Sequence, residues 1–168
     1  MDRTDSSQIR KRLISEQSSM LAQNPGEIDL ARFAQFAYSS EDPEHPLEHL
    51  IDGHGGRGGT RWASARPNGT ERIVLELDHP QRISRLIYEV EECWQERTQE
   101  VRVEVSADRG CTYRQILAQD YTFSPQGATF QHEDLQLDLP AITDLRLTIV
   151  PNKGGAGVAT LTSLRLFT

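Results

Sequence analysis

One of the two tryptophans, Trp94, stands in a polar segment, residues 91–97, which reads EECWQER. An exposed indole ring can stack on the apolar face of a sugar or anchor a protein interface. Glu92 and Arg97 beside it can form hydrogen bonds with hydroxyl groups. The alternative is that Trp94 folds back as a lid over the core, and the residues alone leave both interpretations open.

A glycine-rich segment, residues 53–59 (GHGGRGG), offers backbone N–H groups that could cradle a phosphate or a sugar. It lacks the Gly-Lys-Ser/Thr ending and the strand-to-helix setting of a phosphate-binding loop, so we do not expect a nucleotide. We place the candidate site on three loops, 39–62, 91–98 and 152–157. The candidate ligand-binding residues on these loops are His54, Arg57, Glu92, Trp94, Arg97 and Asn152.

The histidines are candidate metal ligands, and the cysteines are candidates for a metal site or a disulfide bond. His45 and His49 would share one face of a helix, a spacing that suits a transition metal. However, Pro46 fits only in a first helical turn, and no cysteine or third fixed ligand is nearby, so we interpret them as surface residues. Cys93 and Cys111 flank a strand that spans roughly 20 Å, so we expect two free thiols rather than a disulfide.

Alternating segments along most of the chain predict the scaffold that positions these loops. The clearest is 99–105, in which valines alternate with polar and charged residues. Turns rich in Gly, Pro, Asn and Asp, among them 78–80, separate the strands. The other predicted strands are 72–77, 83–90, 113–117, 129–139, 144–150 and 161–167. This pattern predicts an all-β sandwich or barrel, and it argues against a doubly wound nucleotide-binding fold.

The beginning of the chain has a different period. From about Asp5 to Asn24, apolar residues recur at helical spacing, and Asn24-Pro25-Gly26 ends the pattern. We therefore divide the chain into an N-terminal helical extension, 1–27, and a β domain, 28–168. The helix either packs on the β domain or docks on a partner, which includes self-association.

Composition excludes several classes of function. The 168 residues carry a net charge of −7, which argues against gripping nucleic acid or an anionic membrane by charge. No apolar stretch approaches the ~20 residues that span a bilayer, and no signal peptide is visible. We expect a cytoplasmic protein, or an extracellular one if the chain is a processed form. No nucleophile–base arrangement is recognisable, so we do not predict an enzyme. An accessory domain that works beside an enzyme is compatible with the sequence.

Several motifs, in order, resemble the coagulation factor five/eight type C domain, also called the discoidin domain. That family opens with a strand ending in Ser-Ser-Glu, followed by a short helix, an Asp-Gly turn and Thr-Arg-Trp. The corresponding segments here are 34–41, 47–51, 52–53 and 60–62. Segment 103–113 resembles the strand and turn that follow, and 145–147 resembles the late Arg-bearing strand. The resemblance runs from about Ile28 to Phe167.

The resemblance implies a jelly-roll β-sandwich of the galactose-binding-domain-like type, with Trp62 in the core. It implies a binding module that attaches to sugars, lipid head groups or proteins through loops at one end. For the calcium that one branch of the family binds, Asp52 and the Thr60 carbonyl would serve. His54 and Ser163 stand where two further oxygen ligands are expected, which argues against a bound ion.

Our hypothesis from the sequence is a non-catalytic module that recognises a carbohydrate or glycan through loops at one end of the sandwich. No cofactor is expected, and the two replaced ligands argue against a structural calcium as well. The alternative is an intracellular protein–protein interaction or scaffold subunit that uses the same loops or the N-terminal helix.

Overall fold

The computed structural model describes residues 26–168, and the helix predicted over residues 5–24 lies outside them. Residues 26–168 contain two short helices, α2 (Leu30–Phe33) and the 3-10 helix η2 (Leu47–Leu50). The strands are β1 (Ala34–Tyr38), β2 (Trp62–Ala63), β3 (Glu71–Glu91), β4 (Arg97–Ser106), β5 (Arg114–Phe123), β6 (Phe130–Val150), β7 (Thr160–Leu161) and β8 (Ser163–Phe167). The all-β prediction is confirmed. No helix among residues 26–168 is long and apolar enough to cross a membrane.

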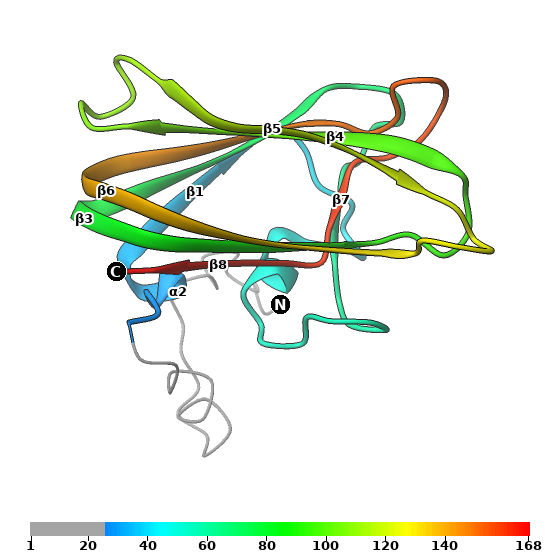
Figure 1. The fold of residues 1–168 in the computed structure, drawn as a ribbon, viewed down its shortest axis with the longest axis horizontal. Coiled ribbons are helices and arrows are strands. Elements are labelled where there is room, and N and C mark those ends of the chain that lie inside the picture. The colour runs from blue at the N-terminus through cyan, green and yellow to red at the C-terminus, as the bar shows by residue number, and fades with distance from the viewer. Residues whose placement is uncertain (1–25) are drawn as a thin grey trace, which may run out of the picture.

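Two long bent strands, β3 and β6, build both layers of a β-sandwich (Figure 1). The first half of β3 pairs with β1 and with the second half of β6, which continues to β4 and β5. The second half of β3 pairs with β8 and with the first half of β6. All of these pairings are antiparallel.

The turn predicted at 78–80 is a bend inside one continuous strand. Register shifts between Glu76 and Arg85 mark the place where β3 passes from one layer to the other. Pro80 lies in this irregular stretch, where its missing N–H costs no ladder hydrogen bond. The segments predicted as 72–77 and 83–90 are therefore the two halves of β3, and those predicted as 129–139 and 144–150 are the two halves of β6.

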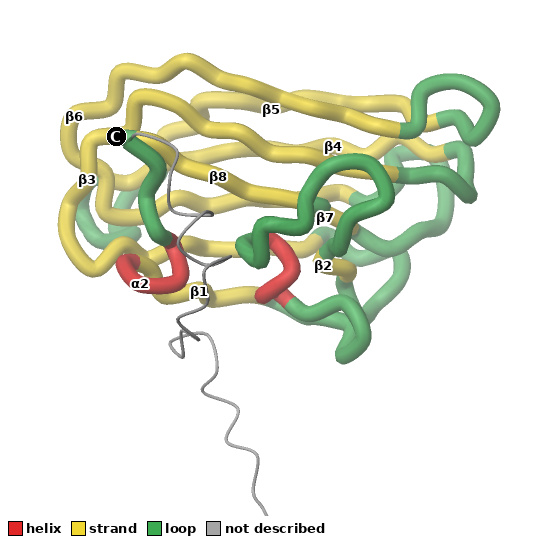
Figure 2. Tube along the Cα trace, turned by 90° about the horizontal axis from the view of Figure 1, so that it is seen from below, coloured by secondary structure: helices red, strands yellow, loops and turns green. Residues whose placement is uncertain are grey.

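Apolar side chains, which alternate with polar ones along the strands, fill the space between the layers. In β4, Val101, Val103 and Val105 are buried, whereas Arg102 is exposed. Trp62 is fully buried, as the family resemblance implied, and its indole Nε1 donates a hydrogen bond to the Ser40 carbonyl at 3.2 Å. Figure 2 shows that most irregular connections gather at one end of this framework. The core therefore fixes the strands, and the strands carry the loops to a common end.

The β4–β5 connection, at the opposite end, is held by Asp108. The Ser106 hydroxyl donates to Oδ1 at 2.6 Å, and the Thr112 backbone N–H donates to the same oxygen at 2.9 Å. The Thr112 hydroxyl donates to Oδ2 at 2.6 Å. These hydrogen bonds stabilise the carboxylate and lower the pKa of Asp108 to about 2.

This lowered pKa predicts a contribution to stability that depends on pH. Because the folded state favours the charged carboxylate, the contribution is present above the ordinary pKa of 3.8 and is lost as pH falls towards about 2. We expect Asp108→Ala to lower the free energy of unfolding at pH 6, and we expect its difference from wild type to shrink between pH 4 and pH 2. Denaturant unfolding at a series of pH values measures this difference.

The matched control for this prediction is Asp138→Ala. Asp138 is largely exposed and lies 3.4 Å from Arg82, an arrangement that contributes little. A difference between Asp108→Ala and wild type that stays constant down to pH 2 contradicts the prediction.

Candidate functional site

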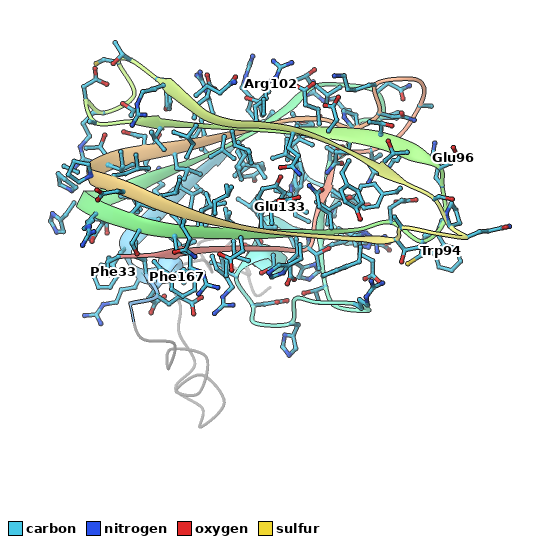
Figure 3. All side chains as sticks on the ribbon, viewed as in Figure 1. Phe33, Trp94, Glu96, Arg102, Glu133 and Phe167 are labelled. Atoms are coloured by element: carbon cyan, nitrogen blue, oxygen red, sulfur yellow. The ribbon has the colours of Figure 1, made fainter. Side chains whose placement is uncertain are left out.

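The loop end of the sandwich is the end formed by the connections 39–61, 92–96, 124–129 and 151–159, and it carries the candidate site (Figure 1). The chain therefore brings together segments that are distant in sequence. Figure 3 shows Trp94 and Glu96 at this end, far from Phe33 and Phe167.

Trp94 projects from the loop between β3 and β4, residues 92–96, which we call the Trp94 loop. Its side chain is 86% exposed, so the alternative in which it covers the core does not hold. The loop is nevertheless braced. Glu92 Oε1 accepts a hydrogen bond from the Gln95 backbone N–H at 2.7 Å, and Gln95 Nε2 donates to the Ala156 carbonyl at 2.7 Å. The structure thus presents a bare indole ring on a fixed support.

Arg97 lies beneath the Trp94 loop rather than on its surface, with 3% of the residue exposed. The cause is its position as the first residue of β4, where it shares the inward face with Gln99 and Val101. Its guanidinium donates hydrogen bonds to Gln99 Oε1 at 2.7 Å, the Pro151 carbonyl at 2.7 Å, the Val158 carbonyl at 3.0 Å and Thr160 Oγ1 at 2.7 Å.

A charge partner accompanies this burial, because Glu92 Oε2 lies 3.5 Å from Arg97 Nε. Burial lowers the pKa of Arg97, and Glu92 opposes that effect. Arg97 was predicted to be a ligand-binding residue. The structure instead buries it as a cross-link that holds β4, the Trp94 loop and the connection 151–159 together.

Asn152 shapes the neighbouring connection. Its Oδ1 accepts hydrogen bonds from the backbone N–H groups of Thr98 at 3.3 Å and Gly154 at 3.2 Å, and its Nδ2 donates to the Ala156 carbonyl at 3.1 Å. Asn152 is half-buried, so part of its amide faces solvent beside the Trp94 loop.

The glycine-rich segment lies over the outer face of β3. Gly56 N–H donates to Glu89 Oε2 and Gly58 N–H donates to Glu91 Oε2, both at 2.8 Å. These glutamates flank the inward-facing Val90, so they point away from the core. Two N–H groups that the sequence offered to a phosphate are thus occupied by carboxylates of the protein itself, which disfavours an anion there.

The two predicted residues of this segment have different surroundings. Arg57 donates to Thr129 Oγ1 at 3.1 Å, and its guanidinium lies 5.0 Å from the centre of the Phe130 ring. It is also close enough to Cys93 to oppose the rise in the pKa of that thiol, which desolvation and Glu91 cause. His54 has 75% of its side chain exposed, and its Nδ1 lies 3.7 Å from Oδ1 of Asp52 in the same loop.

The loop end also carries three residues that were not among the predicted site residues: Arg66, Asn68 and Glu71. Glu71 is fully buried, and its Oε1 lies 3.5 Å from Arg66 Nη2, whose side chain is 65% exposed. Ser39 donates its hydroxyl to the other oxygen of Glu71. Asn68 exchanges hydrogen bonds with Gly157, through N–H to carbonyl at 2.8 Å and through Oδ1 to N–H at 2.9 Å.

A signal for this group was available in the sequence. Glu71 begins an alternating strand and shares a face with Ile73, Leu75 and Leu77, so it is a carboxylate on an otherwise apolar face. A buried carboxylate requires a partner, and Arg66 is that partner. The contact is an ion pair without a hydrogen bond to Glu71 Oε1, and it draws the exposed guanidinium towards the start of β3.

The residues suggested for a metal, Asp52 and Thr60, are hydrogen-bonded to each other within their own loop. Both Asp52 oxygens accept hydrogen bonds within the same loop, from the His54 N–H at 2.8 Å and from Thr60 Oγ1 at 2.6 Å. His49 Nδ1 is 2.8 Å from the Arg61 carbonyl, and His45 Nδ1 is 3.2 Å from Asp42. No group of three or more His, Cys, Asp or Glu side chains within residues 26–168 is arranged to hold an ion. Cys93 and Cys111 are exposed free thiols.

Solved structures share this fold at low sequence identity. A module, CBM32-3, of a family 31 glycoside hydrolase from Clostridium perfringens is 15% identical, with a TM-score of 0.63, covering 92% of this chain and 99% of its own. CpGH89CBM32-5 from Clostridium perfringens, in complex with GalNAc-beta-1,3-galactose, is 19% identical, with a TM-score of 0.55 and coverage of 80% and 95%. The family 32 module of Clostridium perfringens NanJ, in complex with galactose, is 13% identical, with a TM-score of 0.56 and coverage of 80% and 93%.

Comparison with curated protein sequences gives no match. The model of one protein family, described as the F5/8 type C domain, matches residues 35–164. That range extends from β1 to β8 and contains every loop of the loop end, in agreement with the motifs and the sandwich. The chain therefore belongs to the F5/8 type C, or discoidin, domain family.

Proposed function

We propose that this chain is a non-catalytic module that binds a carbohydrate at the loop end, with the Trp94 ring stacked on the sugar. The observation that carries the proposal is the 86% exposure of an indole ring on a braced loop. Such a ring exposes apolar area that water solvates poorly, and the apolar face of a pyranose covers it. The sugar complexes of the two similar modules support the same ligand class.

Polar groups of the loop end can serve the hydroxyl groups of a sugar that stacks on Trp94. The exposed Arg66 guanidinium offers donors, and the buried Glu71 holds it in place. Half-buried Asn152 lies beside the Trp94 loop, and exposed Glu96 offers an acceptor on the loop itself. Because hydrogen bonds within the protein already fix these loops, little conformational entropy is lost when a ligand binds.

A binding role also fits the use of the charged groups. Glu92 and Glu71 are each paired with an arginine, and Arg97 is buried among acceptors of the protein itself. These groups hold loops in place and are not free to transfer protons. If the chain works beside a catalytic domain, it would bind the glycan and the other domain would catalyse the reaction.

A glycan array followed by a fluorescence assay tests this proposal. We expect the full chain to retain neutral glycans, galactose-containing ones among them. Since Trp62 is fully buried and Trp94 is 86% exposed, acrylamide should quench Trp94 selectively, and a bound glycan should protect it. Trp94→Phe, which retains an aromatic ring, is the control that identifies the quenched residue. An array without any hit, or a bound glycan that leaves quenching unchanged, contradicts the proposal.

A further inference from the structure

A cavity of about 210 Å³ opens at the end of the sandwich opposite the loop end. It is formed where β4 ends, β5 begins and β6 bends (Figure 1). Its lining residues are Val105, Ala107, Thr112, Tyr113, Arg114 and Ile142. None of them belongs to the loops of the proposed carbohydrate site.

The floor of the cavity is apolar. Val105 and Ile142 are only 3% and 4% exposed, and both belong to the hydrophobic core. An apolar cavity of about 150 Å³ holds a benzene-sized molecule. The larger space here therefore accommodates one ring together with a small polar substituent.

The rim is held rigidly. The Arg146 guanidinium lies 3.8 Å from the centre of the Tyr113 ring, and Arg146 Nε donates to Glu104 Oε2 at 2.7 Å. Thr112 donates both its N–H and its hydroxyl to Asp108, as described above. A preformed wall of this kind loses little entropy when a small ligand enters.

A free positive charge borders the apolar floor. Arg114 pairs with Val105 in the register of β4 and β5, so both side chains lie on the same face. Within residues 26–168, Arg114 is exposed and its guanidinium has no hydrogen-bond or ion-pair partner. By contrast, the nearby Arg146 is bound to Glu104, and Arg109 donates to the Leu77 carbonyl.

We propose that this cavity is a second binding site, which takes a small carboxylate with an apolar body, such as a one-ring aromatic acid. The ring would lie against Val105, Ile142 and Tyr113. The carboxylate would accept a two-point hydrogen bond from Arg114, the geometry that a guanidinium favours. The site is independent of the proposed carbohydrate site.

Titration of the full chain with benzoate, followed by backbone amide NMR, tests this inference. We expect saturable shifts confined to residues 105–114 and 142, at millimolar concentrations as befits so small a ligand. Arg114→Gln should weaken binding by roughly ten- to a hundredfold, because a charged hydrogen bond contributes about 1.5–3 kcal/mol. Ala107→Leu, at an exposed rim position, should block the cavity without disturbing the core.

Two controls make the result decisive. Arg102→Gln removes a cation from the outer face of β4, and benzoate binding should be unchanged. Benzamide has the same ring without the charge and should bind less tightly than benzoate. The inference is overturned if benzoate gives no saturable shifts, if Arg114→Gln and Ala107→Leu bind it like wild type, or if benzamide binds equally well. A glycan titration is expected to shift loop-end residues only. The carbohydrate site and the benzoate site can therefore each fail without affecting the test of the other.

Discussion

Trp94→Ala is expected to reduce glycan affinity by roughly thirtyfold, because an aromatic hot spot contributes about 2 kcal/mol or more to a binding site. The ring has few partners in the free protein, being 86% exposed, so its loss removes contact with the ligand and little else. The free energy of unfolding should therefore stay within about 0.5 kcal/mol of wild type. Calorimetric titration with a glycan selected on the array, combined with urea unfolding, separates the two quantities.

The graded variant for this prediction is Trp94→Phe. It keeps a flat ring of smaller area, so we expect an affinity between those of wild type and Trp94→Ala. An affinity that does not change in Trp94→Ala means that the sugar lies elsewhere on the loop end. A large loss of stability would instead mean that the ring supports the loop.

Arg97→Leu is expected to lower the free energy of unfolding by about 3–5 kcal/mol, the typical cost of removing one partner from a buried charge pair. Leucine fills part of the space but donates no hydrogen bonds. The Pro151 and Val158 carbonyls would lose their donor, and Glu92 would lose its charge partner. Each buried acceptor left without a partner is destabilising. Chemical denaturation monitored by circular dichroism measures the change.

Arg102→Leu is the matched control, because Arg102 is on the same strand with 46% of its side chain exposed. Its partner Glu100 is buried but keeps a second cation, Lys153 Nζ at 2.9 Å, so we expect the loss of Arg102 to cost only about 1 kcal/mol. Similar stabilities for Arg97→Leu and Arg102→Leu would contradict the role of Arg97 as a buried cross-link. Because Arg97 fixes the support of Trp94, its variant should also bind glycans more weakly.

Local alternation predicted the strands because it records which face of a strand is buried. The pattern in 99–105 became β4, with Val101, Val103 and Val105 in the core. Local sequence also selected Trp94 as a candidate, because it stands in a polar segment, but it left open whether the ring is exposed or covers the core. The ordered motifs of the resemblance predicted the family that the match over residues 35–164 confirms.

The sequence by itself therefore determined the β class and the family, which depend on neighbouring residues and on ordered motifs. It selected Trp94 as a candidate, but the exposure of that ring was decided by the fold. Only the tertiary structure decided which polar groups remain free at the loop end. Arg97 meets its acceptors at Pro151 and Val158, more than fifty residues away, and Gly56 meets Glu89 thirty-three residues away. Such partners are brought together by strand pairing and by the bends of β3 and β6. Because a polar side chain looks the same in sequence whether it faces solvent or satisfies a distant carbonyl, its availability to a ligand is a property of the fold.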